Sequence, residues 1–135
     1  MELSIVPLYA AAFGLGLVAL SIRVIRLRRR SKVSLGGGGQ PALERAIRVQ
    51  ANYSEYVPLA VILLAFVELD GQPDLIVHGL CVLLLAGRGL HAFGVSRTAE
   101  NYRYRVFGMT ATFVVLSAAS LILLTGGSLL TGIFS

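Results

Sequence analysis

The sequence predicts an all-α integral membrane protein, a bundle of four helices that each cross a bilayer. Apolar residues make up 56% of the 135 residues and charged residues only 14%, whereas a soluble domain carries about a quarter charged residues. The apolar residues gather in four runs, and a helix needs roughly 20 such residues to cross about 30 Å of hydrocarbon. When the four runs are placed across a membrane, the basic residues all fall on one side of that membrane. We expect one membrane domain over residues 1–135, with spans at about 3–22, 44–69, 75–93 and 106–124.

The first span, residues 3–22, reaches membrane length without help from polar residues. A secretory signal peptide would begin with basic residues, but the charge before this run is Glu2, and arginines follow the run instead. We therefore interpret it as a retained helix. The stretch LGGGGQP before the second span lacks the Gly-Lys-Ser/Thr of a phosphate-binding loop. We expect it to be a flexible hinge, with Pro41 in the first turn of the next helix.

The second span reaches membrane length only if the polar stretch ERAIRVQANYSEYVP, residues 44–58, is helical too. Four polar residues of this stretch are spaced by three, four and three positions, which places them on one helix face: Arg45, Arg48, Asn52 and Glu55. Glu55 then lies about 15 Å along the helix from Arg45. A charged group within a membrane costs roughly 2.5–3.5 kcal/mol and normally faces a protein interior or a wet cavity. This face therefore predicts a polar site.

The third and fourth spans carry polar residues at the same level. The third ends in AGRGLHAFG, where Arg88 and His91 share a face. Gly87 and Gly89 beside them are expected to permit close approach of a neighbouring helix. The segment NYRYRVFGMT places Arg103 and Arg105 at the start of the fourth. A polar network that only holds the helices together would also account for these residues. However, the basic groups outnumber the single deep carboxylate, Glu55, and an excess of buried arginines favours an anionic ligand.

The distribution of charge predicts the orientation of the bundle. All 12 lysines and arginines fall on one side of the four spans, and positively charged segments stay in the cytosol. The other side carries only acidic charges: Glu2, Glu68, Asp70 and Asp74. Both termini are therefore expected to be non-cytosolic, and the polar site is expected to face the cytoplasm. The basic run 23–32 then lies near anionic lipid headgroups, where nucleic acid is a poor partner.

Metal chemistry and a protein nucleophile both lack support in the sequence. His78 and His91 are thirteen residues apart on one predicted helix, so they cannot share a metal ion there. The single cysteine, Cys81, cannot form an internal disulfide and is expected to be a small core residue. We expect no metal, and we expect any reacting nucleophile to come from a ligand.

The motif E-R-x-x-R-x-x-x-N-x-x-E at residues 44–55 resembles the signature of the membrane-associated proteins in eicosanoid and glutathione metabolism (MAPEG), a family that includes microsomal glutathione transferases and leukotriene C4 synthase. The likeness covers nearly the whole chain. It includes four spans, a basic first loop, G-R-x-x-H late in the third span and an arginine at the start of the fourth. The segments G-R-G-L-H and R-V-F-G-M look most like the bacterial inner-membrane branch of the family.

The resemblance implies a homotrimer that binds glutathione between subunits, on the cytoplasmic side of the inner membrane. The glutathione-binding residues that it implies are Arg48, Gln50, Asn52, Glu55, Tyr56, Arg88 and His91, together with Arg26 or Arg28. The arginine beside the sulfur falls on Arg105, with Arg103 as the alternative. The implied activity is that of a glutathione transferase or peroxidase, in which Arg105 stabilises the thiolate. The thiolate then attacks an apolar electrophile or a lipid hydroperoxide that arrives from the bilayer.

Two other classes of function compete with this enzyme. A non-catalytic protein could bind an anionic metabolite or a lipid headgroup in the same polar cavity, without activating a thiol. A proton- or ion-coupled carrier could use Glu55 as a titrating group within the membrane. Four spans without inverted repeats disfavour the carrier. The second substrate, and whether the thiol is glutathione or another small thiol, stay open at this point.

Overall fold

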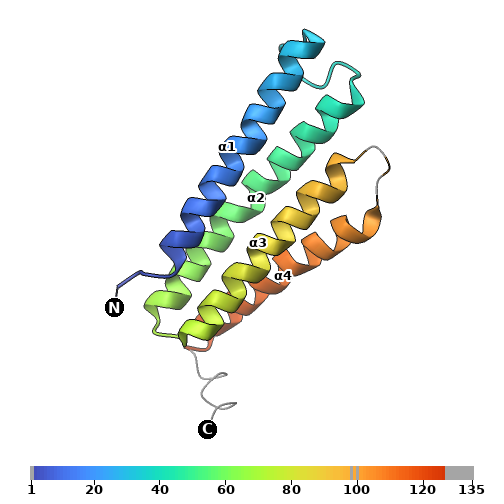
Figure 1. The fold of residues 1–135 in the computed structure, drawn as a ribbon. Helices are drawn as coiled ribbons and strands as arrows, with labels where there is room; N and C mark the ends of the chain where they lie inside the picture. Colours follow the sequence, from blue (N-terminus) through green and yellow to red (C-terminus); the bar gives the residue numbers. More distant parts are fainter. Residues whose placement is uncertain (1, 98, 100, 127–135) are drawn as a thin grey trace.

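The computed structural model describes residues 2–97, 99 and 101–126, and these residues form four helices and no strand (Figure 1). The helices are α1 (Val6–Ser31), α2 (Pro41–Leu69), α3 (Asp74–Ser96) and α4 (Tyr102–Leu124). All four are long and apolar enough to cross a membrane. The predicted all-α membrane bundle is therefore confirmed. The first helix runs nine residues beyond the expected end of its span at residue 22, because the basic segment continues the helix.

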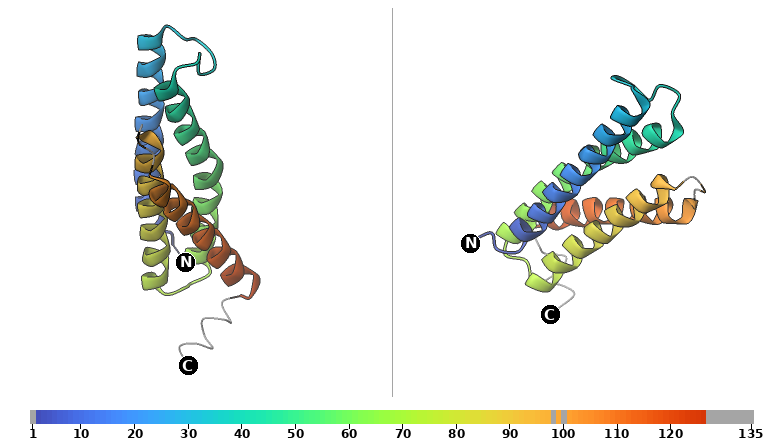
Figure 2. Two further views of the ribbon diagram at one scale, coloured as in Figure 1. Left: turned by 90° about the vertical axis from the view of Figure 1, so that its right-hand side faces the viewer. Right: turned by 45° about the horizontal axis from the view of Figure 1, so that its top comes forward.

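The four helices form two antiparallel pairs, α1 with α2 and α3 with α4. Figure 2 shows that the pairs converge where α2 passes into α3 and separate towards the opposite end. That opposite end carries the two connections that follow α1 and α3. The polar stretch 44–55 is helical throughout and lies in the first half of α2, on the side where the pairs separate. The fold therefore leaves room beside this stretch.

Glycine permits close contact between α3 and α4. A Cβ atom on Gly108 would lie 2.5 Å from the carbonyl oxygen of Gly87, so neither helix could approach this closely with a side chain there. Gly89 was expected to take part as well, but a Cβ atom on it would meet nothing within 4 Å. The close approach thus depends on Gly87 and Gly108, while Gly89 faces outward.

The hydrophobic core fills the end where the helix pairs converge. Its fully buried members come from α2, α3 and α4 and include Leu64, Val77, Leu84 and Val115. Cys81 is buried among them, as expected for a small core residue. Many apolar side chains on the outer faces are exposed, such as Leu15 on α1 at 72%. This distribution suits a surface that contacts lipid chains.

Glu68 ties the start of α1 to the end of α2. The distribution of charge placed it on the non-cytosolic side, and in the structure its side chain is only 9% exposed. Its carboxylate accepts hydrogen bonds from the backbone N–H groups of Ser4 at 2.7 Å, Ile5 at 2.7 Å and Val6 at 2.8 Å. The residue before α1 provides no side-chain cap, so Glu68 satisfies N–H groups that a helix start leaves open.

Replacing Glu68 with alanine is expected to lower the free energy of unfolding by about 2–3 kcal/mol. The substitution leaves three N–H groups without their charged acceptor, and a hydrogen bond to a charged group contributes about 1.5–3 kcal/mol. Thermal unfolding in detergent, followed by circular dichroism, measures the effect. Asp70→Ala is the matched control, because Asp70 is exposed and its carboxylate accepts from Nε2 of Gln72, two residues along the chain, at 2.7 Å. Equal loss in both variants would contradict a capping role for Glu68.

Candidate functional site

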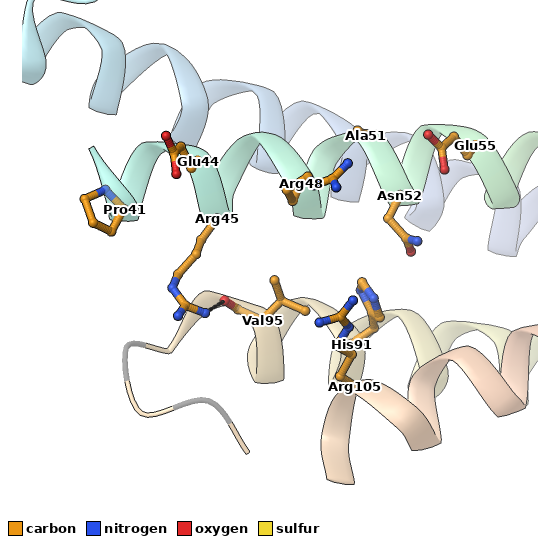
Figure 3. A pocket seen from close by; sticks show the side chains of 10 residues that line it. All are labelled: Pro41, Glu44, Arg45, Arg48, Ala51, Asn52, Glu55, His91, Val95 and Arg105. Atoms are coloured by element: carbon orange, nitrogen blue, oxygen red, sulfur yellow. Dashed lines mark hydrogen bonds between the residues drawn. The ribbon is translucent and has the colours of Figure 1, made fainter. Parts of the chain in front are cut away.

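A cleft of about 540 Å³ lies between the two helix pairs, in the half of the bundle where they separate (Figure 3). Side chains from α2, α3 and α4 line it: Pro41, Glu44, Arg45, Arg48, Ala51, Asn52, Glu55, His91, Val95 and Arg105. Its volume falls in the range of pockets that hold small-molecule ligands, about 300–1,000 Å³. The cleft is mostly polar and carries three arginines.

One face of α2 forms one wall of the cleft. The four residues that the spacing placed on one helix face all line it: Arg45, Arg48, Asn52 and Glu55. Arg48 and Glu55 are exposed. Within residues 2–97, 99 and 101–126, neither of them has a hydrogen-bond or ion-pair partner. Their charges are therefore available to a ligand.

The opposite wall comes from α3 and α4. His91 of α3 and Arg105 of α4 lie across the cleft from Asn52 (Figure 3). His91 is 5% exposed and Arg105 is exposed. Arg105 lines the cleft whereas Arg103 does not, although the two are neighbours on α4. Of the two candidate arginines at the start of α4, Arg105 is thus the one that lines the cleft.

Arg45 bridges the two walls near the mouth of the cleft. Its Nη1 atom donates to the carbonyl oxygen of Val95 at 3.3 Å (Figure 3). The sequence placed Arg45 on the polar face of α2 but did not assign it to the ligand. Its spacing of three positions from Arg48, which places both on one helix face, could have indicated that Arg45 belongs to the same site. Glu44 also lines the cleft, and nothing in its spacing indicated this.

Arg88 lies behind the cleft rather than on its wall. It is only 3% exposed. Its Nη1 atom donates to Oδ1 of Asn52, and its Nη2 atom donates to the carbonyl oxygen of Gly108 at 3.3 Å. The same Nη2 atom lies 3.4 Å from the sulfur of Met109. Arg88 therefore supports Asn52, which does line the cleft.

Four further residues that the resemblance assigned to glutathione lie away from this cleft. Gln50 donates to the hydroxyl of Ser21 on α1 at 2.8 Å. The ring of Tyr56 packs edge-on against Phe113. Arg26 lines a separate groove of about 320 Å³ along α1, which also includes other arginines of that helix. Arg28 donates to the carbonyl oxygen of Gly36 at 2.7 Å. A single chain does not bring these residues to the cleft.

No group of three or more metal-binding side chains gathers in the described part of the chain. The side chains that line the cleft supply three positive charges, hydrogen-bond donors and two exposed carboxylates, Glu44 and Glu55. Such a set suits a ligand with several acidic groups and one amine.

Comparison with known proteins agrees with these observations. The MAPEG family model matches residues 6–125, which is most of the chain. The chain belongs to the MAPEG family. As a MAPEG member it is similar to the inner membrane protein YecN of two Escherichia coli strains, one of them K12. This chain and each YecN sequence are 39% identical over 109 residues, which cover 81% of this chain and 82% of YecN.

Family membership and the four apolar helices together identify a MAPEG membrane protein with an inner-membrane relative. The recognition of the family from the motif at residues 44–55 is thereby confirmed. In this MAPEG protein the motif forms the α2 wall of the cleft, so the most characteristic residues of the sequence line this polar cleft.

Proposed function

We propose that this protein binds glutathione in the cleft and activates its thiol, as a glutathione transferase or peroxidase of the membrane. The observation that carries the proposal is the set of charges in the cleft: three arginines at different heights and two exposed carboxylates, Glu44 and Glu55. Glutathione carries two carboxylates, one ammonium group and a thiol. Membership of a family that includes glutathione transferases supports the same ligand.

The charges of glutathione match those of the cleft in kind. Arg45 and Arg48 can each hold a carboxylate through paired hydrogen bonds, which the planar guanidinium favours. Glu55 can accept the ammonium group. Because Arg48 and Glu55 have no partner among the described residues, a ligand would not have to break existing ion pairs to reach them.

Arg105 is the proposed catalytic residue, because it is the cleft arginine that faces α2 from α4. A free cysteine thiol has a pKa of about 8.5 and is mostly protonated at neutral pH. A cation about 4 Å from the sulfur contributes roughly 4 kcal/mol at an effective dielectric of 20, and each pKa unit corresponds to 1.36 kcal/mol. After desolvation is subtracted, Arg105 can lower the thiol pKa by about one to two units.

The thiolate then reacts with a second substrate that arrives from the bilayer. With an apolar electrophile, sulfur forms a bond to carbon and the leaving group departs. With a lipid hydroperoxide, sulfur attacks the terminal oxygen, the O–O bond breaks, and glutathione sulfenic acid and a lipid alcohol result. Val106 and Phe107, which follow Arg105, are 61% and 54% exposed and offer an apolar surface beside the site.

The complete site is proposed to form in a homotrimer at the cytoplasmic side of the inner membrane. Gln50, Tyr56 and the arginines of α1 lie outside the cleft of one chain, so a neighbouring subunit would have to bring such residues to a shared glutathione. The basic connections at the cleft end of the bundle support a cytoplasmic orientation.

Calorimetric titration of the detergent-solubilised protein with glutathione tests this proposal. Glu55→Gln is expected to weaken binding about tenfold, because it removes the acceptor for the ammonium group and a tenfold change corresponds to 1.4 kcal/mol. The same substitution should have no effect on binding of glutathione that lacks its amino group. Glu2→Gln, at the other end of the bundle, is the control.

Ultraviolet difference absorbance of the bound thiolate distinguishes a glutathione-activating enzyme from a non-catalytic binding protein. Binding of glutathione with a thiolate signal at neutral pH supports the enzyme. Binding without that signal would indicate a non-catalytic protein that holds an anionic metabolite. If the wild-type protein does not bind glutathione at all, the proposal is wrong.

A further inference from the structure

The side chain of Arg88 carries a buried positive charge whose partners are all neutral. Its described hydrogen-bond partners are the amide oxygen of Asn52, a backbone carbonyl and a thioether sulfur. Its Nε atom is buried and has no partner among the described residues. A buried charge is costly unless it is paired or hydrogen-bonded. Among the described residues, Arg88 is thus hydrogen-bonded but has no anionic partner, and its nearest acceptor is Oδ1 of Asn52.

The chemistry of Arg88 decides which way the amide of Asn52 points. A guanidinium group has only hydrogen-bond donors, whereas a carboxamide has an oxygen acceptor at one corner and an NH₂ donor at the other. The corner that faces Arg88 must therefore be the oxygen. Asn52 also lines the cleft (Figure 3). Its NH₂ group is then the corner left for a ligand.

We propose that Arg88 is a positioning residue that holds the oxygen of Asn52, so that the NH₂ group of Asn52 donates into the cleft to a carbonyl or carboxylate oxygen of the ligand. The identity of that ligand as glutathione rests on the proposed function. Its peptide carbonyls and carboxylates supply the acceptor. At this level the cleft selects against an ammonium or amide N–H group, which would face a donor.

The charge of Arg88 also strengthens Asn52 as a donor. A cation that binds the amide oxygen polarises the amide, and hydrogen bonds in a chain reinforce one another in a low-dielectric interior. An anionic group bound to Asn52 would in turn offset the uncompensated charge of Arg88. Arg88 therefore acts on the ligand through Asn52, without touching it.

Asn52→Asp is the sharpest test, because it changes the two corners of the side chain differently. The carboxylate still accepts from Arg88 and now pairs with its charge, so the melting temperature should stay the same or rise. The corner in the cleft changes from a donor to an anionic acceptor. We expect the glutathione dissociation constant to rise 10- to 100-fold. Unchanged affinity would overturn the proposal.

Variants of Arg88 test the positioning step. Arg88→Gln allows the amide of Asn52 to turn either way and should weaken binding about fivefold to tenfold, while Arg88→Lys keeps a cationic donor and should recover most of the affinity. The double variant Arg88→Gln/Asn52→Asp should bind no more weakly than Asn52→Asp alone. Fully additive losses would show that the two residues act separately. If Arg88→Gln fails to fold, Arg88→Lys and Asn52→Asp still decide the question.

Selective ¹⁵N labelling gives a readout that does not depend on glutathione. The chain has two asparagines, Asn52 and Asn101, and Asn101 is exposed and caps α4 through its own side-chain oxygen. In the ligand-free protein, the NH₂ hydrogens of Asn52 should exchange with water about as fast as those of Asn101, because they face the cleft. Strong protection at Asn52 would place its nitrogen in the interior and overturn the inference.

The same spectra separate failure of this inference from failure of the proposed function. When calorimetry shows that glutathione binds, the Asn52 NH₂ signal should move on saturation and the Asn101 signal should not. Binding with an unmoved Asn52 signal would leave the proposed function standing and refute the role of Asn52. No binding in calorimetry would refute the proposed function, and the exchange rate of the ligand-free protein would still test the amide orientation.

Discussion

Arg105→Ala is expected to reduce glutathione-dependent turnover about 8- to 25-fold at pH 7. The substitution removes the proposed cation beside the sulfur, so the pKa of the bound thiol should return from its lowered value towards about 8.5. If Arg105 lowers the thiol pKa by one to two units, the thiolate fraction at pH 7 falls from about 24–76% in the wild type to about 3% in the variant. Turnover of an apolar electrophile by the detergent-solubilised trimer or monomer, whichever is isolated, measures the effect.

The pH dependence of turnover is expected to shift to higher pH in Arg105→Ala. In the wild-type protein the rate should level off above the lowered pKa of the bound thiol. In Arg105→Ala it should keep rising until the pH passes the ordinary thiol pKa of about 8.5. Alkaline pH should therefore restore much of the activity of the variant. Arg103→Ala is the matched control, since Arg103 lies on the same helix outside the cleft. A larger loss in Arg103→Ala than in Arg105→Ala would transfer the role to Arg103.

Gly108→Val is expected to lower the free energy of unfolding by about 3 kcal/mol or more. A Cβ atom at this position would lie 2.5 Å from the carbonyl oxygen of Gly87 and 2.7 Å from the Cβ atom of His91. Overpacking of a close contact typically costs about 1–3 kcal/mol. Here a backbone oxygen is among the obstacles, so α3 and α4 must move apart, and the carbonyl of Gly108 must leave Arg88.

Thermal unfolding and size-exclusion chromatography in detergent measure this loss. Gly89→Ala is the matched control, because it lies two positions from Gly87 on the same helix and a Cβ atom there meets nothing within 4 Å. Alanine is favoured over glycine within a helix by about 0.5–1 kcal/mol, so this control should be neutral or slightly stabilising. A Gly108→Val protein as stable as the wild type would contradict the close packing of α3 on α4.

The polar face of α2 was predictable because a helix repeats in a regular way. The spacing of Arg45, Arg48, Asn52 and Glu55 depends only on 3.6 residues per turn, and these four residues line one cleft in the structure. The motif at residues 44–55 and the family to which it belongs were likewise readable from the chain alone. Local geometry is enough for such predictions.

Contacts between helices were less predictable. The pattern placed Arg88 on the same face as His91, but it could not show that Arg88 lies behind Asn52 rather than on the cleft wall. It also gave Gly87 and Gly89 equal weight, although only Gly87 faces α4. These outcomes depend on how α3 is rotated about its axis, which is set by packing against its neighbours.

The sequence by itself determined that this protein is a four-helix membrane protein of the MAPEG family, since hydrophobic length, the distribution of charge and the α2 motif are all properties of the chain. Only the tertiary structure decided which polar residues meet. It set Arg105 rather than Arg103 in the cleft, buried Glu68 at the start of α1, and placed Arg88 against Asn52. The physical reason is that a helix fixes the angles between its own residues, whereas its rotation against other helices depends on side chains distant in the sequence.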